Sequence, residues 1–385
     1  MKLNVHFPPH WILVCIMALS LAFTFPSCSD GSSGGSDDDS GQITNTANAG
    51  TSGEKSNPSI TTTADNVAEL ITSLEPGEYN IAVTGAITSE TISTIATALK
   101  GNENAKVSLD LSQTTGLTSI GNDAFNDCSS LVSLNIPNKV TSIGNDAFYN
   151  CSSLASVSIP DSVTSIGKGA FQYCKSLSSV AIPDSVTSIG YCAFSYCSSL
   201  KSLNIPASVA SIGKSLFNDC TSLTELTVSE GNSAYKSHEN CIYTKDGKTL
   251  IAAATGLTSV TILDGVTSIN EEVFYFCISL TSITIPDGVT SIGKGAFVGC
   301  SSLTDVSIPD SVTSIDYGAF SYCESLVNVT IPAGVTSIGE RAFVGCNKLK
   351  TVNYKGTQAQ WNAITIANGN DPLTSATINY NYTGE

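Results

Sequence analysis

A cysteine recurs every 23 residues along much of the chain, and this spacing constrains the fold more than any other feature. Five cysteines, and four more after a longer gap, follow it: Cys128, Cys151, Cys174, Cys197, Cys220, Cys277, Cys300, Cys323 and Cys346. A fixed period of roughly 20 to 30 residues is typical of a solenoid, in which each unit contacts only its neighbours. The sequence therefore predicts a stack of similar turns and argues against several globular domains.

The apolar residues within one unit indicate how a turn is built. In the unit that begins at Leu154, Val157 and Ile159 alternate with serines, which predicts a short strand with its apolar side chains in the core. Pro160 then turns the chain, because proline fixes φ and removes a hydrogen-bond donor. Each unit therefore contributes one short strand to a sheet.

The second half of the unit returns apolar groups to the core. Gly167 permits a bend, and a helical turn is expected from Ala170 to Cys174. One phenylalanine per unit falls at the same position: Phe125, Phe148, Phe171, Phe194, Phe217, Phe274, Phe297, Phe320 and Phe343. Each ring, when fully buried between neighbouring turns, contributes roughly 1.5–3 kcal/mol.

The unit C-x-S-L-x-x-I-x-I-P-x-x-V-x-x-I-G-x-x-A-F resembles the BspA-like leucine-rich repeats, a treponemal-type class with 23-residue units. The resemblance covers about residues 107–354. It implies an α/β leucine-rich repeat solenoid with a curved parallel sheet on its concave face, and with short strands and helical turns on its convex side. It also implies a surface protein that binds macromolecules, because family members are described as adhesins for host matrix proteins or neighbouring bacteria.

Composition and the positions of the repeats divide the chain into five predicted segments. These are a signal peptide (1–28), a flexible acidic linker rich in Gly, Ser and Asn (29–59), a small α/β N-terminal cap (60–111), the repeats (112–354) and a C-terminal cap (355–385). Leu223 and Leu257 are 34 residues apart instead of 23, which leaves an 11-residue insertion at about 230–255. Asp246-Gly247 within it predicts a hairpin, which is either a structural brace or a projecting contact.

The caps are expected to shield the two ends of the solenoid core. In the N-terminal cap we expect a helix over Val67–Leu74 capped by Thr63 or Asp65, a strand over Tyr79–Thr84, a helix opened by Ser89, and the first sheet strand over Val107–Leu111. In the C-terminal cap we expect a short capped helix over Thr357–Ile364, with Trp361 covering the open end, and a strand over Ala376–Tyr382.

The apolar run from Trp11 to Phe25, preceded by Lys2, is typical of an export signal. The run ends in Phe25-Pro26-Ser27-Cys28, which resembles a lipoprotein box with Phe25 in place of the usual leucine. The resemblance makes Cys28 the predicted lipidation site, and the alternative is plain secretion with a chance cysteine. The predicted location is therefore the outer membrane, at the cell surface, with the lipid as the only contact with the membrane.

The nine periodic cysteines are predicted to point the same way into the core. Stacked strands about 4.8 Å apart would allow bridges between neighbours, but an odd column cannot pair completely, so buried free thiols are expected rather than disulfides. Cys192 aligns with small or polar residues such as Asp146, Gly169 and Ser215. It is expected to be accessible, as either an incidental thiol or an intermolecular cross-link.

Groups for catalysis or metal binding are sparse. His238, within the insertion, is the only histidine after the signal segment, so no His-based nucleophilic triad or zinc motif can be assembled. The net charge of −16 argues against nucleic acid or an anionic membrane surface as a partner. The sequence predicts a monomer that is not an enzyme and has no cofactor, no metal and no nucleic-acid partner.

The alternation within each strand defines the side chains that face outward on the predicted concave face. The candidate ligand-binding residues are Ser156, Ser158, Ser179, Ser202, Asn204, Glu225, Thr227, Thr261, Ser282, Thr284, Asp305, Ser307, Asn328 and Thr330. They lack the aromatic and arginine anchors of tight interfaces. They either only solvate the sheet or bind an extended extracellular protein or glycan through many weak contacts.

Aspartates follow several of the predicted strands, in most cases after a proline, at Asp161, Asp184, Asp264, Asp287 and Asp310. They are either ordinary turn residues or an acidic ridge for a basic partner or divalent cations. Taken together, the sequence favours a cell-surface adhesion or ligand-binding protein. The alternative is a structural or self-associating envelope component without a host ligand.

Overall fold

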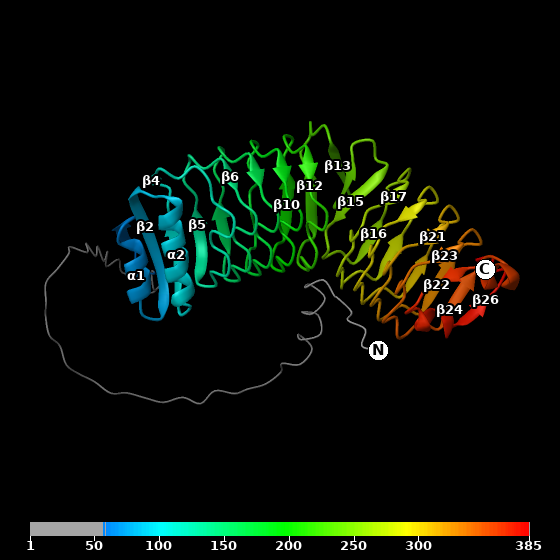
Figure 1. The fold of residues 1–385 in the computed structure, drawn as a ribbon. Coiled ribbons are helices and arrows are strands. Elements are labelled where there is room, and N and C mark those ends of the chain that lie inside the picture. Colours follow the sequence, from blue (N-terminus) through cyan, green and yellow to red (C-terminus); the bar gives the residue numbers. More distant parts are fainter. Residues whose placement is uncertain (1–56, 58, 385) are drawn as a thin grey trace, which may run out of the picture. The chain divides into compact units, whose positions relative to one another are not determined.

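The fold is a parallel β-solenoid of about 14 turns with few helices, and it confirms the predicted leucine-rich repeat architecture. A computed structural model describes residue 57 and residues 59–384. The turns stack in sequence order, as the colours of Figure 1 show. The predicted signal peptide with Cys28, and nearly all of the predicted linker, lie outside the described residues.

The N-terminal cap is a small α/β unit whose sheet runs directly into the repeats. Its elements are β1 (Ser59–Thr63), α1 (Val67–Ser73), β2 (Gly77–Ala86), α2 (Ser89–Gly101), β3 (Ala105–Asp110) and β4 (Thr114–Thr115). The strands β1, β2 and β3 pair in parallel, and β3 pairs with β5, the first repeat strand. The cap therefore extends the solenoid sheet by three strands.

The structure confirms both cap helices but moves their caps. The N-cap of α1 is Asn66, without a side-chain hydrogen bond, rather than Thr63 or Asp65. The N-cap of α2 is Thr88, whose hydroxyl accepts a hydrogen bond from the amide of Thr91 in a capping box. The prediction that Val107–Leu111 is the first strand was wrong, because β1 precedes it. Three consecutive threonines gave β1 too weak an alternation to be recognised.

The long strands follow one another along the stack and pair in parallel in several groups. From the repeats to the C-terminal cap they are β5 (Leu131–Asn135), β7 (Ser156–Ser158), β10 (Ser202–Ile205), β12 (Glu225–Val228), β16 (Ser259–Thr261), β18 (Ser282–Thr284), β20 (Asp305–Ser307), β22 (Asn328–Ile331), β24 (Thr351–Tyr354) and β26 (Thr377–Asn379). Between repeat strands the partners are 23 residues apart, as for Asp305 and Asn328, and they are 26 apart between β24 and β26. We call the outward side of these strands, together with β1, β2 and β3, the long-strand face.

A second parallel ladder is built from the Ser-Ile pair of each unit. Its strands are β6 (Ser142–Ile143), β8 (Ser165–Ile166), β9 (Ser188–Ile189), β11 (Ser211–Ile212), β17 (Ser268–Ile269), β19 (Ser291–Ile292), β21 (Ser314–Ile315), β23 (Ser337–Ile338) and β25 (Thr365–Ile366). The isoleucines are buried, apart from Ile212 and Ile366, which are partly exposed. Each turn is therefore held to its neighbours on two sides.

The third side of each turn, expected to be helical, consists of tight turns. The amide of Phe171 donates to the carbonyl of Ala193 in the next unit, at 2.8 Å, rather than to a residue four positions earlier. Tyr173 then adopts a left-handed φ of 63°, which ends any helical path. Phe171 and its neighbours therefore stitch successive turns together through their backbones.

The core is built from stacked columns, and the predicted phenylalanine column is confirmed. Phe171 is fully buried, and its ring lies 5.2 Å from that of Phe148 and 5.4 Å from that of Phe194, nearly parallel to both. The periodic cysteines are buried free thiols, as predicted. Their sulfurs also bond to the preceding unit, since Cys174 Sγ lies 3.1 Å from the carbonyl oxygen of Phe148.

The prediction that Cys192 is accessible was wrong. Its side chain is 7% exposed, and Ser215, at the same position in the next unit, is 8% exposed. The amide of Cys192 donates to the carbonyl of Lys214, so the next turn closes over this column. Burial raises the pKa of the Cys192 thiol. The column does not require a small residue, since Glu272 and Arg341 occupy the same position; its members share a left-handed φ, which is 54° at Cys192.

The insertion forms the predicted hairpin and is built into the stack. Strand β13 (Tyr235–His238) pairs with β14 (Cys241–Thr244), which pairs with β15 (Thr249–Ala253), both antiparallel, and β15 joins the second ladder through β17. The core divides into two clusters at this point. Ile242 packs in the N-terminal cluster, whereas Cys241 and Tyr243 pack in the C-terminal one. The hairpin therefore acts as a brace between the two clusters.

On the turn side, side chains link the units that flank the insertion. Lys214 Nζ lies 2.9 Å from a carboxylate oxygen of Glu271, and the hydroxyl of Ser215 donates to the carboxylate of Glu272 at 2.6 Å. Asn218 donates to the same oxygen of Glu272 at 3.2 Å. The insertion thus separates these units on the strand sides while they remain in contact on the turn side.

The C-terminal cap closes the last turn as predicted. The helix α3 (Gln358–Asn362) begins after Thr357, which forms a capping box with Gln360, and α4 (Asp371–Thr374) follows. Trp361 is 7% exposed and packs edge-on against Tyr354, with ring centroids 5.1 Å apart. The predicted strand over Ala376–Tyr382 forms β26 over a shorter span, and it extends the long-strand ladder by one strand.

Candidate binding face

Outward side chains on the long-strand face form rows that cross the strands in register. At the N-terminal end one row runs through Ser59, Asn80, Ser108, Ser133 and Ser156, each on the strand next to the last. Parallel strands paired without a register shift place equivalent residues side by side, about 4.8 Å apart. The repeat in the sequence thus becomes a repeat of chemical groups in space.

The structure places all 14 predicted residues on this face, on its long strands or the equivalent extended segment. The exposed ones are Ser156, Ser158, Ser179, Asn204, Glu225, Thr261, Ser282, Thr284, Asp305 and Ser307, and the half-buried ones are Ser202, Thr227, Asn328 and Thr330. Ser179 lies on a segment between β7 and β10 that forms no regular strand. Whether these residues bind a ligand is a separate question.

Side chains on neighbouring strands are linked by hydrogen bonds along the rows. Asn328 Nδ2 donates to Asp305 Oδ1 at 2.6 Å, and Thr227 Oγ1 donates to Asn204 Oδ1 at 3.0 Å. Asn204 Nδ2 in turn donates to Ser229 Oγ at 2.8 Å. These bonds fix the orientation of amides and carboxylates that would otherwise rotate freely in water.

The face is hollowed at three places. The first hollow, of about 240 Å³, lies across β1, β2, β3 and β5. A second, of about 230 Å³, is lined by Ser179, Ser202, Asn204, Glu225 and Thr227 with two apolar neighbours. The third and largest, of about 470 Å³, lies across the strands from β18 to β24. We refer to them as the N-terminal, central and C-terminal hollows.

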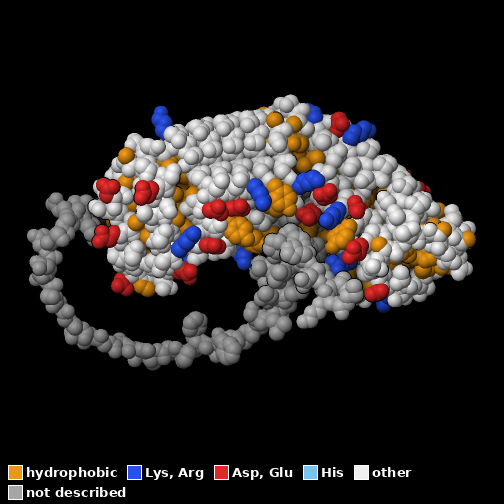
Figure 2. All heavy atoms as spheres, viewed as in Figure 1, with side chains coloured by type: hydrophobic (Ala, Val, Ile, Leu, Met, Phe, Trp, Pro, Cys, Tyr) orange, Lys and Arg blue, Asp and Glu red, His pale blue; other side chains and the backbone are white. Residues whose placement is uncertain are grey.

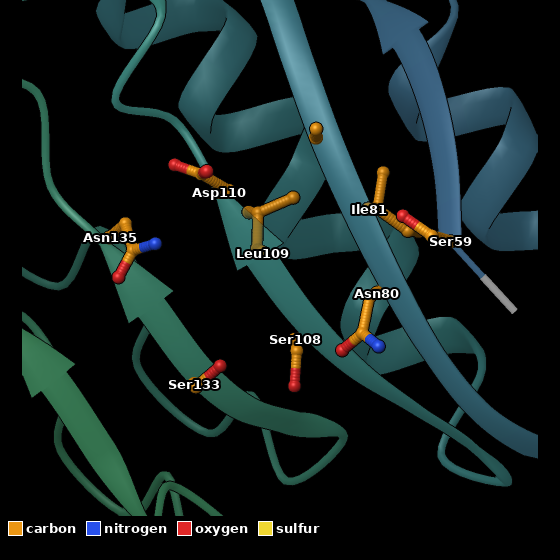
Figure 3. A pocket seen from close by; sticks show the side chains of 9 residues that line it. Ser59, Asn80, Ile81, Ser108, Leu109, Asp110, Ser133 and Asn135 are labelled. Atoms are coloured by element: carbon orange, nitrogen blue, oxygen red, sulfur yellow. The ribbon is translucent and has the colours of Figure 1, made fainter. Parts of the chain in front are cut away.

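The N-terminal hollow contains residues that the sequence did not assign to a site. Figure 3 shows Ser59, Asn80, Ser108 and Asp110 presented on the same face as Ser133 and Asn135 of the first repeat. The signal was present as the alternation of polar and apolar residues in β2 and β3. That alternation predicts only a cap, whereas the cap strands also continue the long-strand face.

The C-terminal hollow has the most varied chemistry. Its lining consists of Thr281, Ser282, Ile283, Thr304, Asp305, Val306, Ser307, Asn328, Thr330, Asn353 and Tyr382. Tyr382, which follows β26, is the only aromatic residue lining any of the three hollows. No sequence pattern indicated this residue, because Tyr382 reaches the hollow only through the fold of the C-terminal cap.

Charge on the long-strand face is low. From β5 to β26 the exposed strand positions carry carboxylates only at Glu225 and Asp305, and no lysine or arginine. Figure 2 shows charged side chains gathered on part of this view, with other side chains and backbone over much of the remaining surface. Among the described residues, no group of three or more His, Cys, Asp and Glu could hold a metal ion. The face offers hydroxyls and amides for hydrogen bonding, and little else.

A second surface feature lies on the turn side of the stack. Tyr149, Tyr173 and Tyr196 are half-buried and contact one another, with ring centroids 5.3 Å and 4.3 Å apart. Burial raises the pKa of each of these phenols. Tyr191 and Tyr322 are more exposed, at 42% and 40%. We refer to these five residues as the tyrosine stripe.

Comparison with known sequences identifies the repeats. The sequence model of the BspA type leucine rich repeat region matches residues 108–245 and 251–369, with six copies. The chain belongs to this family. The match begins within the N-terminal cap, at β3, and reaches into the C-terminal cap. It includes the whole lining of the central hollow, whereas Ser59 and Asn80 of the N-terminal hollow and Tyr382 of the C-terminal hollow lie outside it. No curated protein sequence matches the chain.

Several solved BspA-type and other leucine-rich repeat structures are similar to this one. A leucine-rich cell surface protein from Faecalibacterium prausnitzii shares 30% identity, covering 65% of this chain and 86% of that one, with a TM-score of 0.42. The pneumococcal vaccine antigen PcpA shares 22% identity over 66% of this chain and 69% of that one, with a TM-score of 0.51. The leucine-rich repeat protein of Treponema pallidum shares 30% identity over 51% and 77%, with a TM-score of 0.35.

These comparisons establish the fold and suggest a role only in general terms. Leucine-rich repeat solenoids of the BspA type are typically interaction scaffolds without catalytic activity, and the family suggests a role in protein interaction or adhesion in general terms. Within the part of the chain that the structure describes, no helix is long and apolar enough to cross a membrane.

Proposed function

We propose that the protein is a cell-surface adhesion module that binds an extracellular macromolecule on its long-strand face, without catalysis. One observation carries the proposal: outward hydroxyls and amides recur on the long strands from β1 to β26, in register within each of four paired groups, and most of them are exposed. A long face with weak, repeated contacts suits an extended or repetitive ligand, because many such contacts add up to a useful affinity.

We propose that the solenoid is tethered through a lipid on Cys28, with the segment after it as a spacer. The support is the apolar run before Cys28 and the small polar residues after it. The test compares wild-type cells with cells that carry Cys28→Ser, using metabolic lipid labelling and protease treatment of intact cells. Surface tethering predicts that the wild type is labelled and shaved, whereas the variant is unlabelled and released. Protection of the wild type until the envelope is opened would show a periplasmic protein and would exclude adhesion.

Binding on the long-strand face is tested with bulky substitutions. Ser158→Trp and Ser282→Trp each place a large ring on an exposed strand position of this face. Lys168→Trp is the matched control, because Tyr191 occupies the same position one unit later and shows that the turn accepts an aromatic residue. We expect adhesion of cells to fibronectin, laminin or partner bacteria to fall with the first two variants only. Equal adhesion of all three variants would contradict a binding role for this face.

A second candidate function is self-association in the envelope, and the tyrosine stripe favours it. Tyr149, Tyr173 and Tyr196 form a contiguous, partly exposed aromatic row, and such rows are typical of protein contact surfaces. Tyr191 and Tyr322 add two further exposed rings on the turn side. Light scattering of the purified protein over a range of concentrations distinguishes the two. Concentration-dependent assembly that Tyr191→Ser and Tyr322→Ser abolish would support self-association, whereas a constant monomer mass would leave adhesion by single molecules.

A further inference from the structure

The C-terminal hollow differs from the other two in size and in its lining. It is the largest of the three, at about 470 Å³ compared with about 240 and 230 Å³. Its floor includes the partly exposed Ile283, and Tyr382 stands at its edge on the far side of β24. The hollow therefore combines an apolar base, an aromatic side chain and polar groups on several strands, as ligand sites generally do.

The polar lining restricts the charge of the ligand. It consists of the hydroxyls of Thr281, Ser282, Thr304, Ser307 and Thr330, the amides of Asn328 and Asn353, the phenol of Tyr382 and the carboxylate of Asp305. No cationic side chain lines the hollow, so an anionic ligand would find no partner and would be repelled by Asp305. A neutral ligand rich in hydroxyl groups matches this lining.

Hydrogen bonds within the lining orient the amides and leave defined capacity for a ligand. Asn328 Nδ2 donates to Asp305 Oδ1 at 2.6 Å, which leaves the second carboxylate oxygen of Asp305 as an acceptor. Asn353 Oδ1 accepts from Asn379 Nδ2 at 3.0 Å, which leaves the amide hydrogens of Asn353 as donors. Acceptors and donors thus lie on strands spaced about 4.8 Å apart, a spacing close to the length of one sugar ring.

Tyr382 is held in position by the backbone beside it. Its amide donates to the carbonyl of Tyr354 at 3.0 Å, and the amide of Asn381 donates to the carbonyl of Gly356 at 2.8 Å. The Tyr382 side chain is half-buried, and its hydroxyl forms no hydrogen bond with another described residue. An aromatic ring on a backbone anchored in this way can pack against the apolar face of a sugar, and its hydroxyl can bond to the sugar's substituents.

We propose that the C-terminal hollow binds a neutral glycan, with Tyr382 packed against one sugar ring and Asp305, Asn328 and Asn353 bonded to the hydroxyls of its neighbours. This inference rests on the proposed binding function of the long-strand face and names the ligand class. A protein ligand fits less well, because the hollow offers none of the arginine or tryptophan anchors on which tight protein contacts depend.

The test is isothermal titration calorimetry of the purified protein with defined oligosaccharides. The neutral probes are cellohexaose, laminarihexaose, mannohexaose, xylohexaose and maltohexaose, and the anionic probes are heparin and hyaluronan fragments of similar length. We expect at least one neutral probe to bind. Tyr382→Ala should weaken that binding by about tenfold or more, as the loss of one stacking contact requires, while Tyr382→Phe should retain most of it.

Variants of equivalent residues elsewhere on the face control for general effects. Asn328→Ala should weaken binding of the neutral probe, whereas Asn135→Ala in the N-terminal hollow and Asn204→Ala in the central hollow should leave it unchanged. Binding of none of the neutral probes, binding of the anionic probes alone, or equal effects of all three asparagine variants would overturn the inference. If Ser158→Trp and Ser282→Trp still abolish cell adhesion in that case, the proposed function stands and only the ligand class is wrong. If adhesion is unaffected as well, both fail.

Discussion

Replacing the stacked glycines with alanine tests how closely the turns approach. A Cβ added to Gly167 would lie 2.5 Å from the carbonyl carbon of Gly144 and 2.6 Å from the amide nitrogen of Asn145 in the preceding turn. The φ of Gly167 is not left-handed, so the residue is needed for this close approach and not for the bend expected from the sequence. Non-bonded carbon atoms prefer about 3.5–4 Å, so Gly167→Ala must move two turns apart by about 1 Å.

Gly121 is the matched control, since it holds the same position in the first repeat. A Cβ there meets nothing within 4 Å, because no equivalent turn precedes it. We expect Gly167→Ala to lower the free energy of unfolding by about 1–3 kcal/mol, as overpacking does. Gly121→Ala should be neutral or stabilising by up to about 1 kcal/mol, because alanine restricts the unfolded chain.

Urea unfolding followed by circular dichroism measures both variants, and hydrogen exchange shows where the damage lies. Since a solenoid transmits strain to its nearest neighbours, amide protection should fall in the turns that contain Gly144 and Gly167 before it falls beyond the insertion. Equal stability of Gly167→Ala and the wild type would refute the close-packing argument. So would a loss at Gly121→Ala as large as that at Gly167→Ala.

Three further predictions concern the core and the junction. Phe171→Ala should lower the free energy of unfolding by about 3–5 kcal/mol, because it leaves a cavity between two stacked rings. Hydrogen exchange should rise mainly in the N-terminal core cluster. Uniform loss of protection in both clusters would contradict the division at the insertion. Cys192, which is 7% exposed, should react with a maleimide about 100-fold more slowly in the native protein than in urea, and rapid native labelling would show that the column opens. Burial raises the pKa of Asp219 to about 6, although the charge of Lys175 opposes this shift. The folded state therefore holds this proton more tightly than the unfolded chain does. Above pH 6 the ionised carboxylate lowers the free energy of unfolding. Asp219→Asn, which keeps the preference for a left-handed φ, should therefore raise the free energy of unfolding by about 1–3 kcal/mol at pH 7.5. This stabilisation should disappear as the pH falls from 6 to 4. If the carboxylate were solvated, the variant would not be stabilised at either pH.

The repeats were predictable because the forces that shape each unit act within it or between identical neighbours. The strand at Ser156–Ser158, the buried phenylalanines and the free cysteines all follow from the alternation and the 23-residue period. Both cap helices also followed from local periodicity. The hairpin turn at Asp246-Gly247 was recognisable for the same reason, since a two-strand turn is specified by its own residues.

Errors in the prediction arose where contact with a distant segment outweighs local pattern. Cys192 was expected at the surface because its column holds polar and small residues, but the following turn covers it. The threonines of β1 gave no clear strand signal, and pairing with β2 decides their conformation. In both cases the deciding partner lies more than 15 residues away.

The sequence by itself determined the stack, its period, the identity of its core columns and the row of polar residues on its long strands. It did so because each turn repeats the same local instructions and buries its apolar side chains only against copies of itself. The tertiary structure decided where that row is hollowed, that cap strands β1 to β3 extend it, and that Tyr382 lines the same hollow as Asp305 and Asn328. Those features depend on how the two non-repeating ends pack against the repeats, and no periodicity encodes such contacts.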